Sequence, residues 1–211
     1  MGTTNEMILL RAGTGETRIR LGAVAKVTSV AFTPDSRHIV AVVGRSITVW
    51  ELGGFGEVRT KILRGVQPEL VTMAHTGSQV LVSGKEESNC MLLLTIDLQS
   101  GHLAKNPVYE LDGSPSNISH STLSPFGTYI ASINDDGDLM MHSCETCELL
   151  WRLPRALFAK ARLQFSPDEV CVVGLQFEPR VFAAFNVADG RALWSKEAPK
   201  DATAFAFARW A

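Results

Sequence analysis

Apolar and polar residues alternate in short stretches along this chain, and a turn follows each stretch. The pattern Phe-Thr-Pro-Asp at 32–35 returns as Phe-Ser-Pro-Asp at 165–168 and, more weakly, as Leu-Ser-Pro at 123–125. Intervals of 41, 50 and 42 residues separate the last apolar residues before the turns, and a further step of 42 reaches Phe207; these residues are Phe32, Met73, Leu123 and Phe165. Period-two alternation bounded by Pro, Asp and Gly turns is typical of β-strands.

The repeats share the same interior. A second apolar strand follows each turn, at 39–43, 80–82, 129–133 and 170–173. A fourth strand closes each unit, after a third strand whose last residue is Trp50, Ile96, His142 or Phe185. Four short antiparallel strands per repeat of about 42 residues predict the blade of a β-propeller. Because one such sheet cannot bury both faces alone, neighbouring blades are expected to pack face to face.

The predicted fold is therefore all-β, a single β-propeller or propeller segment of four-stranded antiparallel blades. Its full repeats cover about 27–63, 69–111, 117–153 and 160–195, and its partial units cover 7–21 and 202–211. The second repeat is longer than the others. Its extra residues are expected within 84–90 and near 106–107 or 112–116.

The number of predicted strands bears on whether the ring closes. Two strands precede Val27, sixteen belong to the full repeats and one lies at 202–208, which gives nineteen. A five-bladed ring would need one strand more. We therefore favour an incomplete ring, which a second chain or a missing segment completes, over a closed five-bladed ring.

Composition and charge exclude several classes of protein. The chain has 211 residues, of which 45% are hydrophobic, so it can bury a core and is not expected to be disordered. With 20 Lys and Arg against 22 Asp and Glu, it lacks the basic surface that nucleic acids or membranes would attract. The start of the chain does not resemble a secretory signal, and the apolar runs are too short to span a bilayer. We expect a soluble, intracellular protein of the cytoplasm or nucleus.

Candidate reactive groups have simpler structural interpretations. Cys144 and Cys147 form a CxxC beside His142, but a structural zinc site wants four ligands, and the other two cysteines are isolated. The pair falls in the turn between a third and a fourth strand, where two unrelated thiols are the better interpretation. The sequence shows no nucleophile motif, and its Gly-rich turns are followed by strands, whereas a phosphate loop is followed by a helix. We therefore expect neither an enzyme nor a metal or cofactor site.

One repeat carries a family resemblance. Trp50-Glu51 stands where the WD-repeat propeller family has its Trp-Asp pair, and the chain from about 7 to 208 resembles that family. In the other units the pair has drifted to Ile96-Asp97, His142-Ser143 and Phe185-Asn186. The family's Gly-His pair does not occur, and its turn Asp survives only around 134–137. The resemblance implies a rigid disc whose loops and central opening hold peptides or partner domains, and hence a non-enzymatic scaffold in a larger assembly.

Loops joining the strands are the candidate partner-binding residues. The most suggestive loop places Leu157 and Phe158 between Arg155 and Lys160, like an aromatic anchor with a charged rim. The alternative is that this loop is tucked over its own blade. Further candidates lie in the loops 64–68 and 112–116 and at Lys85, Glu86 and Glu87.

A second function class is an enzyme, or a ligand- or cofactor-binding propeller, with its site at the central channel. An enzyme of this kind needs His, Asp or Glu at the starts of the first strands. Those positions instead hold mostly apolar residues, namely Val27, Leu70, Ile118 and Ala161 or their neighbours.

Overall fold

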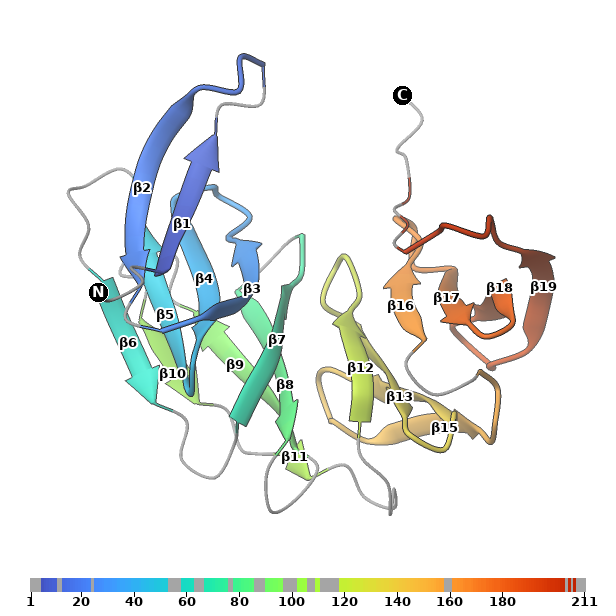
Figure 1. The fold of residues 1–211 in the computed structure, drawn as a ribbon. Coiled ribbons are helices and arrows are strands. Elements are labelled where there is room, and N and C mark those ends of the chain that lie inside the picture. The colour runs from blue at the N-terminus through green and yellow to red at the C-terminus, as the bar shows by residue number, and fades with distance from the viewer. Residues whose placement is uncertain are drawn as a thin grey trace.

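The computed structural model is all-β in the part of the chain that it describes (Figure 1). That part comprises residues 5–10, 13–23, 25–52, 58–62, 67–75, 78–85, 90–96, 102–105, 109–110, 118–157, 161–203, 205 and 207. It contains five antiparallel sheets, and none of them closes on itself. The expectation of an all-β chain built from four-stranded antiparallel sheets is confirmed.

The strands follow the chain in simple up-and-down order. A two-stranded sheet comes first, formed by β1 (Asn5–Leu10) and β2 (Thr17–Ala23). Sheet I consists of β3 (Val27–Phe32), β4 (His38–Val43), β5 (Ser46–Glu51) and β6 (Val58–Ile62). Sheet II consists of β7 (Gln67–Met73), β8 (Gln79–Lys85), β9 (Cys90–Ile96), β10 (Leu103–Lys105) and β11 (Tyr109–Glu110).

The last two sheets repeat the plan of sheet I. Sheet III consists of β12 (Ile118–Leu123), β13 (Tyr129–Asn134), β14 (Leu139–Ser143) and β15 (Leu149–Leu153). Sheet IV consists of β16 (Arg162–Phe165), β17 (Cys171–Phe177), β18 (Arg180–Asn186) and β19 (Ala192–Glu197).

Two strand predictions differ from the structure. The outer strand of sheet II is split, because β10 pairs with one half of β9 and β11 with the other. The expected strand at 202–208 is not formed at the described positions 202, 203, 205 and 207. Phe205 instead packs edge-on against Phe182 of β18, with ring centroids 5.4 Å apart.

In sheets I, III and IV, the turn after the first strand has a side-chain hydroxyl that explains why the motif recurs, whereas sheet II has Ala74 at this position. Thr33 Oγ1 and Ser166 Oγ each donate to the carboxylate two residues later, Asp35 and Asp168, at 2.6 and 2.5 Å. The same hydroxyls accept the N–H that opens the second strand. Ser124 accepts in the same way in sheet III. The local sequence therefore fixes the entry into the second strands of these three sheets.

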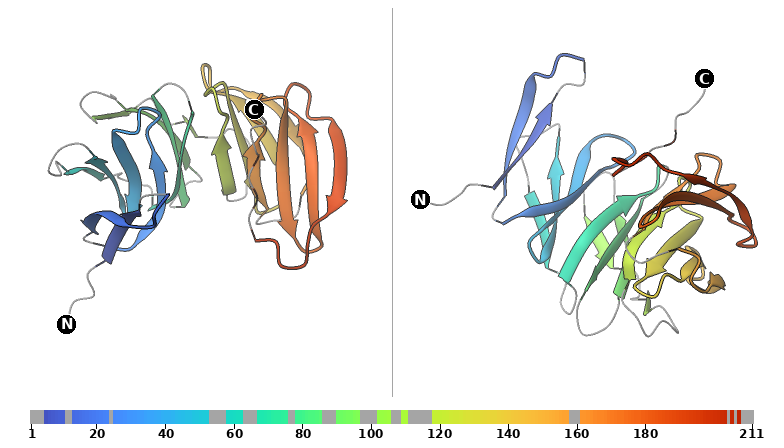
Figure 2. Two further views of the ribbon diagram at one scale, coloured as in Figure 1. Left: turned by 90° about the horizontal axis from the view of Figure 1, so that it is seen from above. Right: turned by 45° about the vertical axis from the view of Figure 1, so that its right-hand side comes forward.

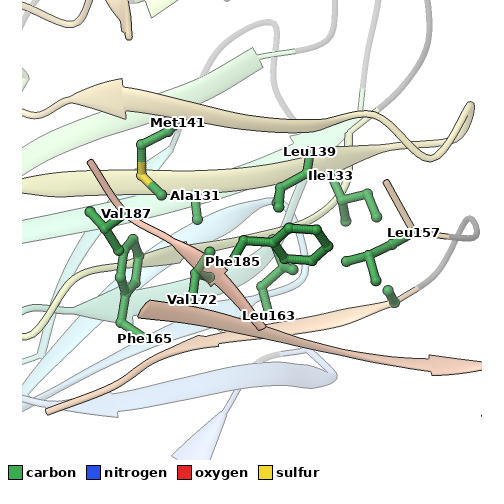
Figure 3. Close-up of a cluster of buried hydrophobic side chains, with 11 residues drawn as sticks. Ala131, Ile133, Leu139, Met141, Leu157, Leu163, Phe165, Val172, Phe185 and Val187 are labelled. Carbon is green, nitrogen blue, oxygen red and sulfur yellow. The ribbon is translucent and has the colours of Figure 1, made fainter. Parts of the chain in front are cut away.

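Consecutive sheets pack through their first strands. Val71 of β7 is buried against the apolar face of β4 and β5, which is formed by Val40, Val42, Ile47 and Val49. Leu163 and Phe165 of β16 pack in the same way against sheet III (Figure 3). Hydrogen bonds reinforce two of these contacts: Val71 N–H donates to Ser29 Oγ at 3.1 Å, and Leu163 N–H donates to His120 Nδ1 at 3.4 Å.

The sheets follow one another around an arc. The first strands β3, β7, β12 and β16 lie on its inner side, and the strands β6, β10, β15 and β19 lie farther out (Figure 1). The β1–β2 pair lies at one end of the arc and sheet IV at the other, as the further views show (Figure 2). The array therefore has two terminal sheets, the β1–β2 pair and sheet IV.

Trp151 of β15 ties the outer edge of sheet III to sheet IV. Its indole Nε1–H donates to the Val187 carbonyl at 2.7 Å, and a Cβ at Gly190 would lie 3.0 Å from its ring. Trp194 occupies the corresponding position of sheet IV, 43 residues later, and is 49% exposed.

We expect Trp151→Phe to lower the free energy of unfolding by about 1 kcal/mol, because a part-buried hydrogen bond is lost while most of the ring contact remains. Trp194→Phe is the matched control and should change it by less than about 0.5 kcal/mol, since that side chain faces solvent. Urea unfolding of both variants measures the difference. Equal losses would show that the indole hydrogen bond contributes nothing.

Candidate partner-binding surfaces

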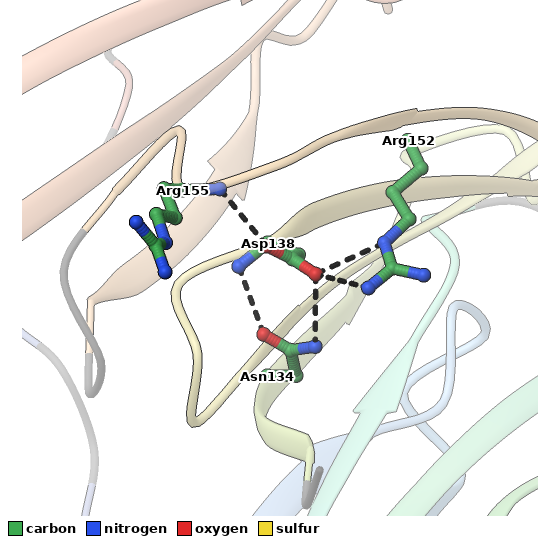
Figure 4. Close-up of polar contacts among 4 residues, drawn as sticks. All are labelled: Asn134, Asp138, Arg152 and Arg155. Atoms are coloured by element: carbon green, nitrogen blue, oxygen red, sulfur yellow. Dashed lines mark hydrogen bonds and ion pairs between the residues drawn. The ribbon is translucent and has the colours of Figure 1, made fainter. Parts of the chain in front are cut away.

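The loop from β15 to β16 is held by a buried carboxylate (Figure 4). Asp138 is 4% exposed and accepts from the backbone N–H of Arg155 at 2.9 Å. Its other oxygen pairs with the Arg152 guanidinium, and Asn134 accepts the Asp138 N–H at 2.8 Å. The sequence pointed to a surviving turn Asp around 134–137. The residue that makes these contacts is the next one, Asp138.

These contacts set the charge state of Asp138. The hydrogen bond from Arg155 N–H lowers its pKa most, burial opposes that effect, and the Arg152 side chain lowers it further. The pKa therefore lies below the ordinary value, and the carboxylate is ionised at neutral pH. Sheet III thus holds the loop through a charge-assisted hydrogen bond, which the backbone N–H of Arg155 donates to the Asp138 carboxylate.

Within this loop, the structure separates two of the predicted contact residues. Leu157 is 4% exposed and lies in the core between sheets III and IV, with its N–H donating to the Gly137 carbonyl at 3.2 Å. A Cβ at Gly174 would lie 2.3 Å from Leu157 Cδ1, so the missing side chain of Gly174 makes room for it. Leu157 therefore adopts the tucked arrangement, which was the alternative to a surface anchor.

Arg155 faces solvent, as does the neighbouring Pro154. Arg155 has a positive φ of 50°, and the hydrogen bond from its N–H to Asp138 holds that backbone in place. Its side chain is exposed. Phe158 and Lys160 lie outside the described residues, so their part of the prediction stays a prediction.

The other predicted contact positions are described only in part. Lys85 is the last residue of β8, while Glu86 and Glu87 lie outside the described residues. The same holds for 112–116 and for most of 64–68, of which Gln67 and Pro68 belong to β7.

Two histidines of sheet III, the buried His142 and the half-buried His120, are neutral. Burial lowers the pKa of His142 to about 4. Burial, followed by the charge of Arg162, lowers the pKa of His120 to about 4 as well. His120 Nδ1 accepts a backbone N–H, which a neutral imidazole can do and a protonated one cannot. Both residues therefore serve packing at neutral pH.

The CxxC lies in the β14–β15 turn, as its position in the repeat predicts. Cys147 has a positive φ of 60° and its N–H donates to the Ser143 carbonyl at 2.9 Å. Burial raises the pKa of Cys144 to about 12, so its thiol is not activated as a nucleophile. Across the described ranges, no group of three or more His, Cys, Asp or Glu side chains is placed to hold a metal ion.

Large apolar side chains are exposed near both ends of the arc, a feature that sequence reasoning missed. At the β1–β2 end they are Ile8, Val30 and Phe32, and on sheet IV they include Leu193 and Trp194. The repeat could have indicated two of them, Val30 and Phe32. The same positions are filled by Val71 and Met73 in the second repeat and by Leu163 and Phe165 in the fourth. Those later positions face the preceding sheet.

The chain matches no protein-family model, and no curated protein matches it. The part of the chain that the structure describes holds no helix long and apolar enough to cross a bilayer. The repeats and the surfaces that they present are therefore the features that bear on function.

Proposed function

We propose that this protein is a non-enzymatic scaffold for protein–protein interactions, built as a β-propeller segment of the WD-repeat type. It would present loops of a rigid array to partner proteins or peptides within a larger intracellular assembly. Buried residues fill the position of the family's Trp in all four repeats and so support a common blade plan; they are Trp50, Ile96, His142 and Phe185.

The fixed loop at Arg155 is the observation that carries this proposal. Asp138 holds the loop backbone on one side and the buried Leu157 anchors it on the other, so the Arg155 side chain is displayed on a rigid support. A preorganised surface residue loses little conformational freedom when a partner binds. Arginine is also among the residues that contribute most to protein interfaces.

We expect Arg155→Glu to reduce the recovery of co-purifying proteins about tenfold when the full chain captures partners from its native cell extract. Arg191→Glu makes the same charge change at an exposed turn residue and should leave recovery unchanged. Mass spectrometry quantifies the captured proteins. Equal recovery by both variants would contradict a role for this loop.

Phe158→Asp extends the test to the neighbouring residue of the predicted anchor. Capture should fall while the urea unfolding midpoint stays the same. A protein that no longer folds would instead assign Phe158 to the core, together with Leu157.

A further inference from the structure

The β1–β2 pair corresponds to the third and fourth strands of the other sheets. Its pairing slips between Leu9 and Leu10, as the equivalent pairing slips between Met141 and His142 in sheet III and between Ala184 and Phe185 in sheet IV. Five residues after these slips, Gly15, Cys147 and Gly190 all have positive φ values, of 69°, 60° and 72°. The first sheet is therefore the outer half of a blade.

A third strand normally has two neighbours. In sheets I, III and IV, the strands β5, β14 and β18 pair with a fourth strand on one side and a second strand on the other. Among the described residues, β1 pairs only with β2. Its other edge thus presents backbone N–H and C=O groups that can bind a further strand.

Two side chains of sheet I also lack the packing partner that their counterparts have in later units. In later units, the corresponding side chains pack on the second strand of the sheet before them: Val71 against Val40 and Val42, and Leu163 and Phe165 against Ala131 and Ile133. At the β1–β2 end, Val30 and Phe32 are 48% and 50% exposed. Two apolar side chains and a strand edge therefore border the same position.

We propose that this edge is a strand-acceptor site, which binds an extended, apolar segment of a partner protein by pairing with β1 and covering Val30 and Phe32. The inference rests on the scaffold function and names a surface and a partner class for it. The chemistry is set by the strands that fill this position elsewhere: β4 and β13 are six residues long, with buried aliphatic side chains facing the next blade. Main-chain hydrogen bonds would supply affinity, and the aliphatic positions specificity.

A peptide from this chain's own third repeat tests the proposal. The probe is fluorescein-labelled Thr-Tyr-Ile-Ala-Ser-Ile-Asn-Asp, the sequence of residues 128–135, which contains β13. We expect saturable binding to the full-length chain, and slower amide hydrogen exchange at residues 5–10 in the complex. A peptide with proline in place of its central Ala should not bind, because proline removes a strand N–H and restricts the backbone.

Charged substitutions locate the binding site. Val30→Asp and Phe32→Asp should each weaken peptide binding about tenfold or more. Leu150→Asp, at a residue of similar exposure on β15, is the control and should bind like the wild type. Unchanged urea midpoints in all three variants would confirm that folding is intact.

Three results would overturn the proposal. They are no binding of the β13 peptide, equal binding by the Phe32→Asp and Leu150→Asp variants, or a concentration-dependent dimer that buries Val30 and Phe32, which would make a second copy of the chain the occupant. A negative result in these peptide experiments would not affect the Arg155→Glu capture test of the loop. If only the capture prediction failed, the loop hypothesis would be wrong and the strand-acceptor site would be unaffected.

Discussion

Acidification from pH 7 to pH 5 is expected to destabilise the fold by about 4 kcal/mol through two histidines of sheet III. His120 and His142 stay neutral in the folded chain because burial lowers the pKa of each to about 4. Unfolding returns them to an ordinary pKa of 6.5. Between these values the unfolded state binds more protons, so stability is lost as the pH falls.

Urea unfolding at pH 7, 6 and 5 measures this dependence. Most carboxylates are still ionised throughout this range, so they contribute little to it. His142→Phe should remove about half of it, or about 2 kcal/mol, and sheet IV carries Phe at the equivalent position, Phe185. His120→Gln should remove a similar share while its amide oxygen still accepts the Leu163 N–H. If both variants kept the full acid sensitivity of the wild type, the two imidazoles would not be its source.

Much of the sheet arrangement could be predicted from the repeat, because period-two alternation and Ser/Thr-Pro turns are local signals. The predicted second strands at 39–43 and 129–133 correspond to β4 and β13. The hydroxyls of Thr33 and Ser166 satisfy turn N–H groups within five residues, so their role needs no distant partner. Local sequence accordingly predicts local structure well in this chain.

The direction of single side chains in the loops was harder to predict, since it depends on residues far away in the sequence. Leu157 is buried because Gly174, seventeen residues later, has no side chain in its way. Phe205 packs on Phe182, and the split between β10 and β11 falls in the longer second repeat. Alternation alone contains none of this information.

Replacing Asp138 by Ala is expected to lower the free energy of unfolding by about 3 kcal/mol, because it removes a buried charge partner and leaves the Arg155 N–H without its acceptor. Three groups lose a contact in this variant: the Arg152 guanidinium, the Arg155 backbone and the Asn134 amide. The Arg152 side chain is 34% exposed, so water can solvate it in the variant and the loss stays below that of a fully buried pair.

Two further variants separate the causes. Asp138→Asn keeps an oxygen that can accept from Arg155 N–H but loses the charge, and should cost about half as much as the alanine change. Asp136→Ala alters an exposed carboxylate two residues away in the same turn and should cost less than about 0.5 kcal/mol. Urea unfolding gives the three values, and hydrogen exchange at residues 155–157 reports whether the loop is released.

The pH dependence of stability gives a further check. Because the hydrogen bond from Arg155 holds the pKa of Asp138 below its ordinary 3.8, the difference in stability between wild type and Asp138→Asn should be complete above about pH 4 and vanish as the pH falls further. Equal losses for Asp138→Ala and Asp136→Ala would mean that this carboxylate does not hold the loop, and Arg155 would then lose the rigid support on which its proposed role depends.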